Sequence, residues 1–384
     1  MFYHDHVVGE SKNYSFLMQH YSPTARDECL CRSIDVVSLA YLSHQKHSPS
    51  ALAEARRQYV NALRLVRKAL QSPESASKDS TLLSILLLDM YEKISNRKPQ
   101  YDGAWASHIR GAFSLVRLDG DQQHRQLDRL HMLERLSTNI LISCTVSDGD
   151  IPNELLALQM IVTSPLKRRK FELMVNFARL NRQAKFRLLS DDEIVGSAIK
   201  LDSQFLELSS QIPPSWRHET VSVEAKSAHH YEQYHYTYTN EHMGQMWNVF
   251  RLTRILICEM IVSYCSQPLI NSILDSENST LEYAITTITQ LSREICATVP
   301  ESLTKPADAK NHLPCYRLIF PLYVAAQSPT ASEAMIQYAI QQLCFIAGAH
   351  GIEDALVIAR ILELGERTNP WEVYALLGSY AFVC

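Results

Sequence analysis

The sequence predicts an all-α protein, with one large domain of packed antiparallel helices around a buried central layer. Gly accounts for 11 of the 384 residues, well below the usual share of about 7%. Sheets with tight turns and phosphate-binding loops need more Gly than this. Apolar residues make up 46% of the chain, enough for a large core. Because apolar residues recur every three or four positions, we expect an irregular lead-in over residues 1–25 and a helical domain over residues 26–384.

The first two predicted helices differ in character. Residues 48–71 begin with Ser48, a good N-cap, and Pro49 at the first helical position, and their apolar residues form one stripe. Residues 80–94 are instead apolar on nearly all sides. Such a helix must be covered on most of its surface, so it predicts the central layer.

Apolar stripes predict further helices along the rest of the chain, and no segment alternates convincingly enough to predict a strand. Their expected ranges are 105–118, 126–143, 153–162, 168–187, 191–210, 240–265, 279–299, 314–327, 330–348, 352–366 and 370–382. Residues expected to be largely buried include Leu83, Leu86, Leu87, Phe113, Trp247 and Phe250.

The net charge and the cysteine content indicate which kinds of partner the protein binds and in which compartment it resides. The formal net charge is −4, whereas a protein that binds nucleic acid over its whole surface is basic. We therefore expect no direct sequence-specific DNA binding by this chain. The stretch Ala334–Ile352 is uncharged but contains several Gln residues, so we expect a core helix and no membrane association. Nine mostly isolated Cys residues favour reduced thiols inside the cell.

Motifs of catalysis and cofactor binding are missing. The sequence has no GxxxxGK[ST], GxGxxG, HExxH, GxSxG or CxxCH pattern. Cys29 and Cys31 form the only close cysteine pair, whereas a zinc site needs four well-spaced ligands. We expect no cofactor and no metal.

One segment is unusually rich in His and Tyr. Between Trp216 and Trp247 lie five histidines and four tyrosines. They could line a polar, aromatic pocket in which a histidine carries protons near neutral pH. They could equally belong to a connection whose aromatic rings seal the helical core, and this simpler interpretation is favoured.

A basic run, KRRK at residues 167–170, precedes further basic residues along the same predicted helix. It could be a nuclear-import or phosphate-contacting patch. The more usual role of such a run is the solvated face of a helix.

Five stretches together resemble the fungal-specific transcription factor domain. They are WASHIRGAFSLVRL at 105–118, IPPSWR at 212–217, WNVFRLTRI at 247–255, LIFPLYVAA at 318–326 and NPWEV at 369–373. They occur in the order found in that family and span roughly residues 30–380. The resemblance implies an all-α regulatory domain in the nucleus, with the cytoplasm as the alternative, that senses a metabolite or contacts other regulatory proteins. Many members control secondary metabolism or nutrient use.

The sequence departs from the family in one respect. Members carry an N-terminal binuclear zinc cluster, which needs six closely spaced cysteines, and no such cluster follows Met1. Three explanations stay open: a DNA-binding part was removed, the protein is a stand-alone co-regulator, or the scaffold was repurposed for small-molecule chemistry.

Candidate ligand-binding residues are the polar and aromatic groups expected to border a cavity between helices: Trp105, His108, Trp216, Tyr236, Trp247 and Arg251. The ligand would be an effector or a pathway metabolite. Arg251 and Arg254 could anchor an acidic ligand, although ion pairs within the scaffold, for example with Glu259, are favoured.

The alternative function is an isomerase, cyclase or hydrolase that acts on a secondary metabolite. His229, His230 or His235 would then supply the proton-transfer group. A third alternative is a plain helical scaffold that holds two partners.

Overall fold

The computed structural model describes residues 17, 27–46, 48–76, 78–95, 127–153, 155–156, 164–265, 274–304, 313–366 and 368–377. The chain divides into two compact units, Met1–Thr163 and Ser164–Phe382. The prediction that residues 26–384 form a single domain stays a prediction. The predicted helix over 105–118, with Phe113, lies outside the described residues.

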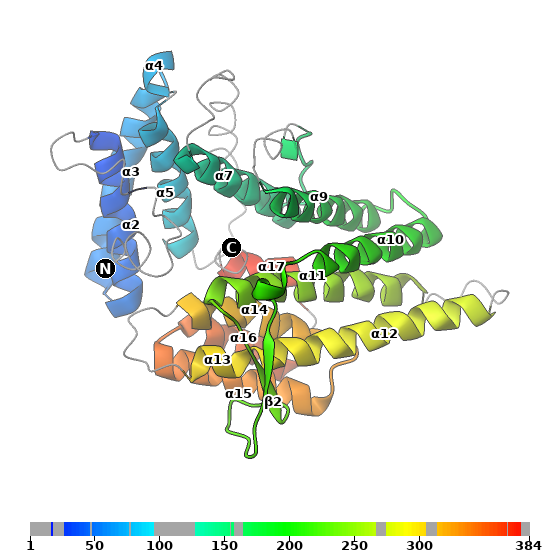
Figure 1. Cartoon of the computed structure of the whole chain (residues 1–384). Helices are drawn as coiled ribbons and strands as arrows, with labels where there is room; N and C mark the ends of the chain where they lie inside the picture. Colours follow the sequence, from blue (N-terminus) through cyan, green and yellow to red (C-terminus); the bar gives the residue numbers. More distant parts are fainter. Residues whose placement is uncertain are drawn as a thin grey trace. The chain divides into compact units, whose positions relative to one another are not determined.

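Unit 1, Met1–Thr163, is built from helices in its described part (Figure 1). Helix α2 packs against both α3 and α5, and α5 packs against α7. Leu83, Leu86 and Leu87 of α5 are buried, which confirms that this helix is covered on several sides. The elements are α2 (Glu28–Lys46), α3 (Pro49–Ala69), α4 (Pro73–Ala76), α5 (Asp79–Ser95) and α7 (Leu127–Val146).

Unit 2 places α11 at its centre. Helix α11 packs against α10, α12 and α14, and α14 in turn packs against α15, α16 and α17 (Figure 1). The helices are α9 (Pro165–Lys185), α10 (Asp191–Ser210), α11 (Glu241–Cys265), α12 (Leu274–Ala297), α13 (Val299–Leu303), α14 (Leu313–Gln327), α15 (Glu333–His350), α16 (Glu353–Leu364), α17 (Pro370–Leu377) and the short 3-10 helix η2 (Pro214–Trp216).

Local sequence signals explain where several helices begin and end. The side chain of Ser48 accepts a hydrogen bond from the backbone of Ala51 at the start of α3, as its N-cap role predicts. Ser190 and Glu193 form a capping box at the start of α10. Helices α15 and α16 end at Gly351 and Gly365, both with φ of 66°, because glycine adopts the left-handed conformation without strain.

The predicted all-α class is confirmed, with one local correction. Residues Glu219–Ser222 (β1) and Tyr234–Thr237 (β2) pair as a two-stranded antiparallel sheet, although the sequence predicted no strand. This segment has only four residues per strand, and all four of β1 are exposed, so no apolar alternation marked it. Helix α2 was also not identified from its sequence.

Burial follows the predictions closely. Phe250 is buried, whereas Trp247 is only partly buried because it lies where the β-hairpin meets α11. No described helix is long and apolar enough to cross a membrane.

Candidate functional site

Four of the six predicted ligand-binding residues come together around Arg251. Its side chain is 2% exposed. Its Nε donates a hydrogen bond to Glu294 on α12 at 2.9 Å. Its Nη1 donates to the Tyr238 hydroxyl at 2.9 Å and to the Asn248 side chain at 3.1 Å. The guanidinium is therefore held by groups of the protein itself.

Aromatic rings surround the same guanidinium. Its carbon lies 5.4 Å from the ring centre of Tyr236 and 5.7 Å from that of Trp247, within the range of cation–π attraction. The indole Nε1 of Trp247 donates to the backbone carbonyl of Trp216 at 2.7 Å. These contacts join η2, β2, α11 and α12 into one cluster. Trp105 and His108 lie outside the described residues.

The second predicted arginine, Arg254, forms a separate ion pair. It donates two hydrogen bonds to Asp202 of α10, at 2.7 and 3.0 Å. Asp202 is 1% exposed and also accepts a hydrogen bond of 2.6 Å from Tyr283. Both arginines therefore link helices within the scaffold, as favoured from the sequence, and their partners come from α10 and α12.

The three candidate histidines lie on the β-hairpin. His229 Nδ1 is hydrogen-bonded to Gln342 of α15 at 2.8 Å, and the Tyr338 hydroxyl donates to the His229 carbonyl at 2.7 Å. His230 Nε2 lies 3.2 Å from His235 Nδ1. These bonds tie the loop between the strands to α15, and a role in proton transfer stays a prediction. Within the described ranges, no group of three His, Cys, Asp or Glu residues is placed to hold a metal ion.

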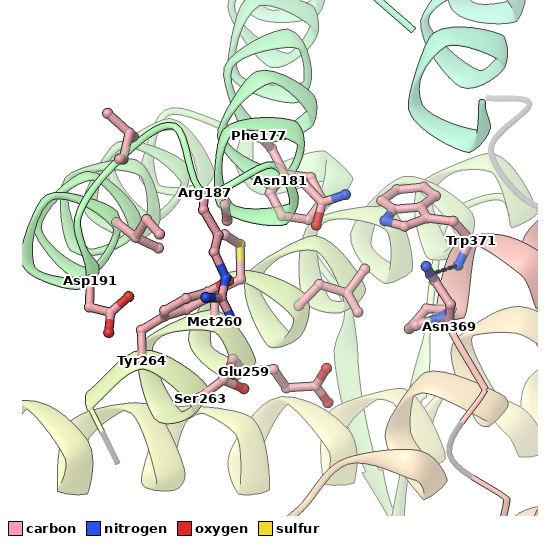
Figure 2. Close-up of a pocket in the computed structure, with 15 residues that line it drawn as sticks. Phe177, Asn181, Arg187, Asp191, Glu259, Met260, Ser263, Tyr264, Asn369 and Trp371 are labelled. Atoms are coloured by element: carbon pink, nitrogen blue, oxygen red, sulfur yellow. Dashed lines mark hydrogen bonds between the residues drawn. The ribbon is translucent and has the colours of Figure 1, made fainter. Parts of the chain in front are cut away.

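A cavity of about 570 Å³ lies elsewhere in unit 2, between α9, α10, α11 and the start of α17 (Figure 2). None of the four described residues of the predicted site lines it. Its wall combines apolar and aromatic groups with three charged residues. The lining residues are Phe177, Asn181, Ala184, Arg187, Leu189, Asp191, Ile194, Leu256, Glu259, Met260, Ser263, Tyr264, Asn369, Pro370 and Trp371.

The local sequence explains why these side chains face the cavity. After α9, the backbone amide of Leu188 donates to the carbonyl of Gln183 at 2.9 Å, and Arg187 adopts a left-handed conformation with φ of 51°. This turn reverses the chain, so α10 starts at the cavity edge. On the opposite side, Asn369 caps α17 by accepting a hydrogen bond from the Trp371 backbone amide at 2.9 Å.

Trp371 forms a rigid wall of the cavity. Its ring lies 6.0 Å from that of Phe177 and 6.2 Å from that of Tyr374, and the residue is 8% exposed. No local sequence pattern predicts this cavity, because its lining comes from segments far apart in the chain. Its one sequence signal was the NPWEV stretch at 369–373.

A family model described as fungal specific transcription factor domain matches residues 6–358. No curated protein and no solved structure matches the chain.

Proposed function

Because the chain belongs to the family of fungal-specific transcription factor domains, we propose that it is a regulatory domain that senses a small-molecule effector in the cavity of unit 2. The observation that carries the proposal is the cavity itself. Its volume of about 570 Å³ is in the range of sites for small organic molecules. Its mixed lining offers both apolar surface and a few polar groups to orient a ligand.

The position of the cavity supports a switching role. Its lining comes from α9, α10, α11 and α17, so a bound molecule would contact four helices at once. A ligand that fits one arrangement of these helices better than another shifts the population toward that arrangement. In our proposal, this shift changes which surface the domain presents to other regulatory proteins.

The domain acts in the nucleus, contacts other regulatory proteins, and relays the level of a metabolite from a fungal secondary pathway. It makes no sequence-specific contact with DNA itself, in keeping with its net charge of −4. The basic run at residues 167–170, which opens α9, supports import into the nucleus.

Filling the cavity tests this proposal. The full chain is joined to a DNA-binding module and tethered to a reporter promoter in fungal cells. Ser263→Trp places a large side chain in the cavity, and Ser203→Trp is the matched control on α10. Both serines are exposed, and each donates a hydrogen bond to the carbonyl four residues earlier. Ser203 does not line the cavity.

We expect the tethered native chain to change reporter expression, and Ser263→Trp to alter that output about fivefold or more, as typical coupling free energies imply. Ser203→Trp should behave like the native chain. Equal output from all three proteins, or no effect of the tethered native chain, would contradict the proposal. Far-ultraviolet circular dichroism verifies that both variants keep their helices.

A further inference from the structure

We infer that the cavity of unit 2 takes a small monocarboxylate with an aromatic or aliphatic body, and that Arg187 binds its carboxylate. This inference rests on the proposed function, because it names the chemical class of the effector. It follows from the backbone at Arg187, from the hydrogen-bonding groups around the cavity and from the charges of its wall.

The backbone of Arg187 adopts a conformation that is unfavourable for a residue with a side chain. Its φ of 51° lies in the left-handed region, where α15 and α16 both use glycine to end, with φ of 66°. A side chain there is strained, and such strain persists where the surroundings or a function require it. Figure 2 shows the result: the guanidinium points into the cavity, beside Met260 and Tyr264. A glycine would end α9 more easily but would leave no cation in the cavity.

Arg187 is an exposed residue, and its guanidinium has no hydrogen bond or ion pair with any residue that the structure describes, whereas the more buried Arg251 and Arg254 are both paired with carboxylates. The Asn181 amide and the Tyr264 hydroxyl, which also line the cavity, likewise have no hydrogen-bond partner within the described ranges. Each of these three groups can donate to a carboxylate. Arginine can do so with two parallel bonds.

The other charges of the wall limit the ligand's charge. Asp191 and Glu259 also line the cavity, so a ligand with two negative charges would meet two carboxylates and only one arginine. With Arg187, the wall carries one positive and two negative charges, so each negative charge on a ligand adds repulsion, and a single carboxylate bound to Arg187 meets less repulsion than a ligand with two. The rest of the ligand would lie along Phe177, Leu256 and Trp371, whose apolar surface favours an aromatic or aliphatic body.

Three related compounds test the inference: naphthalene-1-acetate, its neutral amide and 1-naphthyl phosphate. Their binding to the full chain is measured by isothermal titration calorimetry. We expect the carboxylate to bind about tenfold more tightly than the amide, as a charge-assisted pair of hydrogen bonds implies, and the phosphate to bind more weakly than the carboxylate. Arg187→Gln should remove the preference for the carboxylate over the amide.

Two further variants separate the effect on binding from the effect on folding and provide a control. Arg187→Gly should also lose the preference, yet raise the melting temperature, because glycine relieves the left-handed strain. Arg360→Gln removes an exposed arginine on α16 that does not line the cavity, so its preference should equal that of the native chain. Arg187→Gly thus separates loss of binding from loss of folding.

Several results would overturn the inference: equal binding of carboxylate and amide, a preference that survives Arg187→Gln, or no binding of the carboxylate to the native chain. If carboxylate and amide bind equally and Ser263→Trp abolishes both, the cavity is a ligand site and only the inferred class is wrong. If the reporter is also unaffected by Ser263→Trp, the proposed function fails as well.

Discussion

Trp247 and Trp216 are joined by a hydrogen bond of 2.7 Å from the indole Nε1 of one to the backbone carbonyl of the other. The two residues are 31 positions apart, and the whole β-hairpin lies between them in the chain. The bond therefore closes the hairpin segment onto the first turns of α11. Gly244 makes room for this closure, because a Cβ there would lie 3.1 Å from the ring of Tyr238.

The indole hydrogen bond should contribute measurably to stability. Trp247→Phe keeps an aromatic ring but leaves the partly buried Trp216 carbonyl without its donor. We expect the free energy of unfolding to fall by about 1–2 kcal/mol, measured by urea denaturation. Trp216→Phe is the matched control, because the acceptor is a backbone atom that this change retains. If the control is as destabilised as Trp247→Phe, the bond is not the cause.

Among the residues clustered around its guanidinium, Arg251 should cost the fold the most stability when it is replaced. Arg251→Met leaves Glu294, Tyr238 and Asn248 without their shared donor. Removing one partner of a buried ion pair costs about 3–5 kcal/mol, so thermal denaturation should show a large loss of stability. Arg360→Met, at an exposed position on α16, should change the melting temperature little. A loss below about 1 kcal/mol for Arg251→Met would show that the cluster adds little to the fold.

His218 should make stability depend on pH. Burial, followed by the positive charge of Arg251, lowers the pKa of His218 below its ordinary value of 6.5. The unfolded chain therefore binds more protons in the interval between the lowered and the ordinary pKa. The stabilising contribution is complete above pH 6.5 and is lost as the pH falls through the lowered value.

His218→Phe tests this dependence while keeping a ring against Tyr236, on which His218 stacks at 3.7 Å. Between about pH 7.5 and pH 5.5, the native chain should lose more unfolding free energy than the variant. Comparing the two proteins cancels the effect of histidines such as His230, whose pKa is lowered by burial and then by the nearby His235. Parallel pH profiles would disprove the role of His218.

Duplex DNA should bind the chain weakly and without sequence preference. The formal net charge of −4 supports no strong attraction to phosphates, and any residual binding should fall steeply between about 50 and 200 mM salt. Fluorescence anisotropy with promoter and scrambled duplexes measures both properties. A preference for one promoter at physiological salt would refute this expectation.

Helix periodicity predicted much of the fold because each helix buries a stripe defined by its own residues. The predicted range 191–210 coincides with α10, and its capping box is visible in the sequence as Ser190 and Glu193. The hairpin was not predictable in this way, since β1 is exposed along its whole length. The hairpin contacts α11, α12, α13 and α15, and no local sequence pattern predicts these contacts.

For the candidate site, too, some features follow from the sequence and others only from the tertiary structure. The sequence alone determined that Arg251, on an apolar helix, needs partners, because burying an unpaired charge is too costly. It also marked Trp216, Tyr236 and Trp247 as residues of one region. Only the tertiary structure decided that Glu294 and Asp202 pair with the two arginines and that the described cavity lies instead around Arg187 and Trp371. Local sequence sets which residues must be buried or capped, whereas a cavity forms where helices distant in the chain meet and fail to fill the space between them.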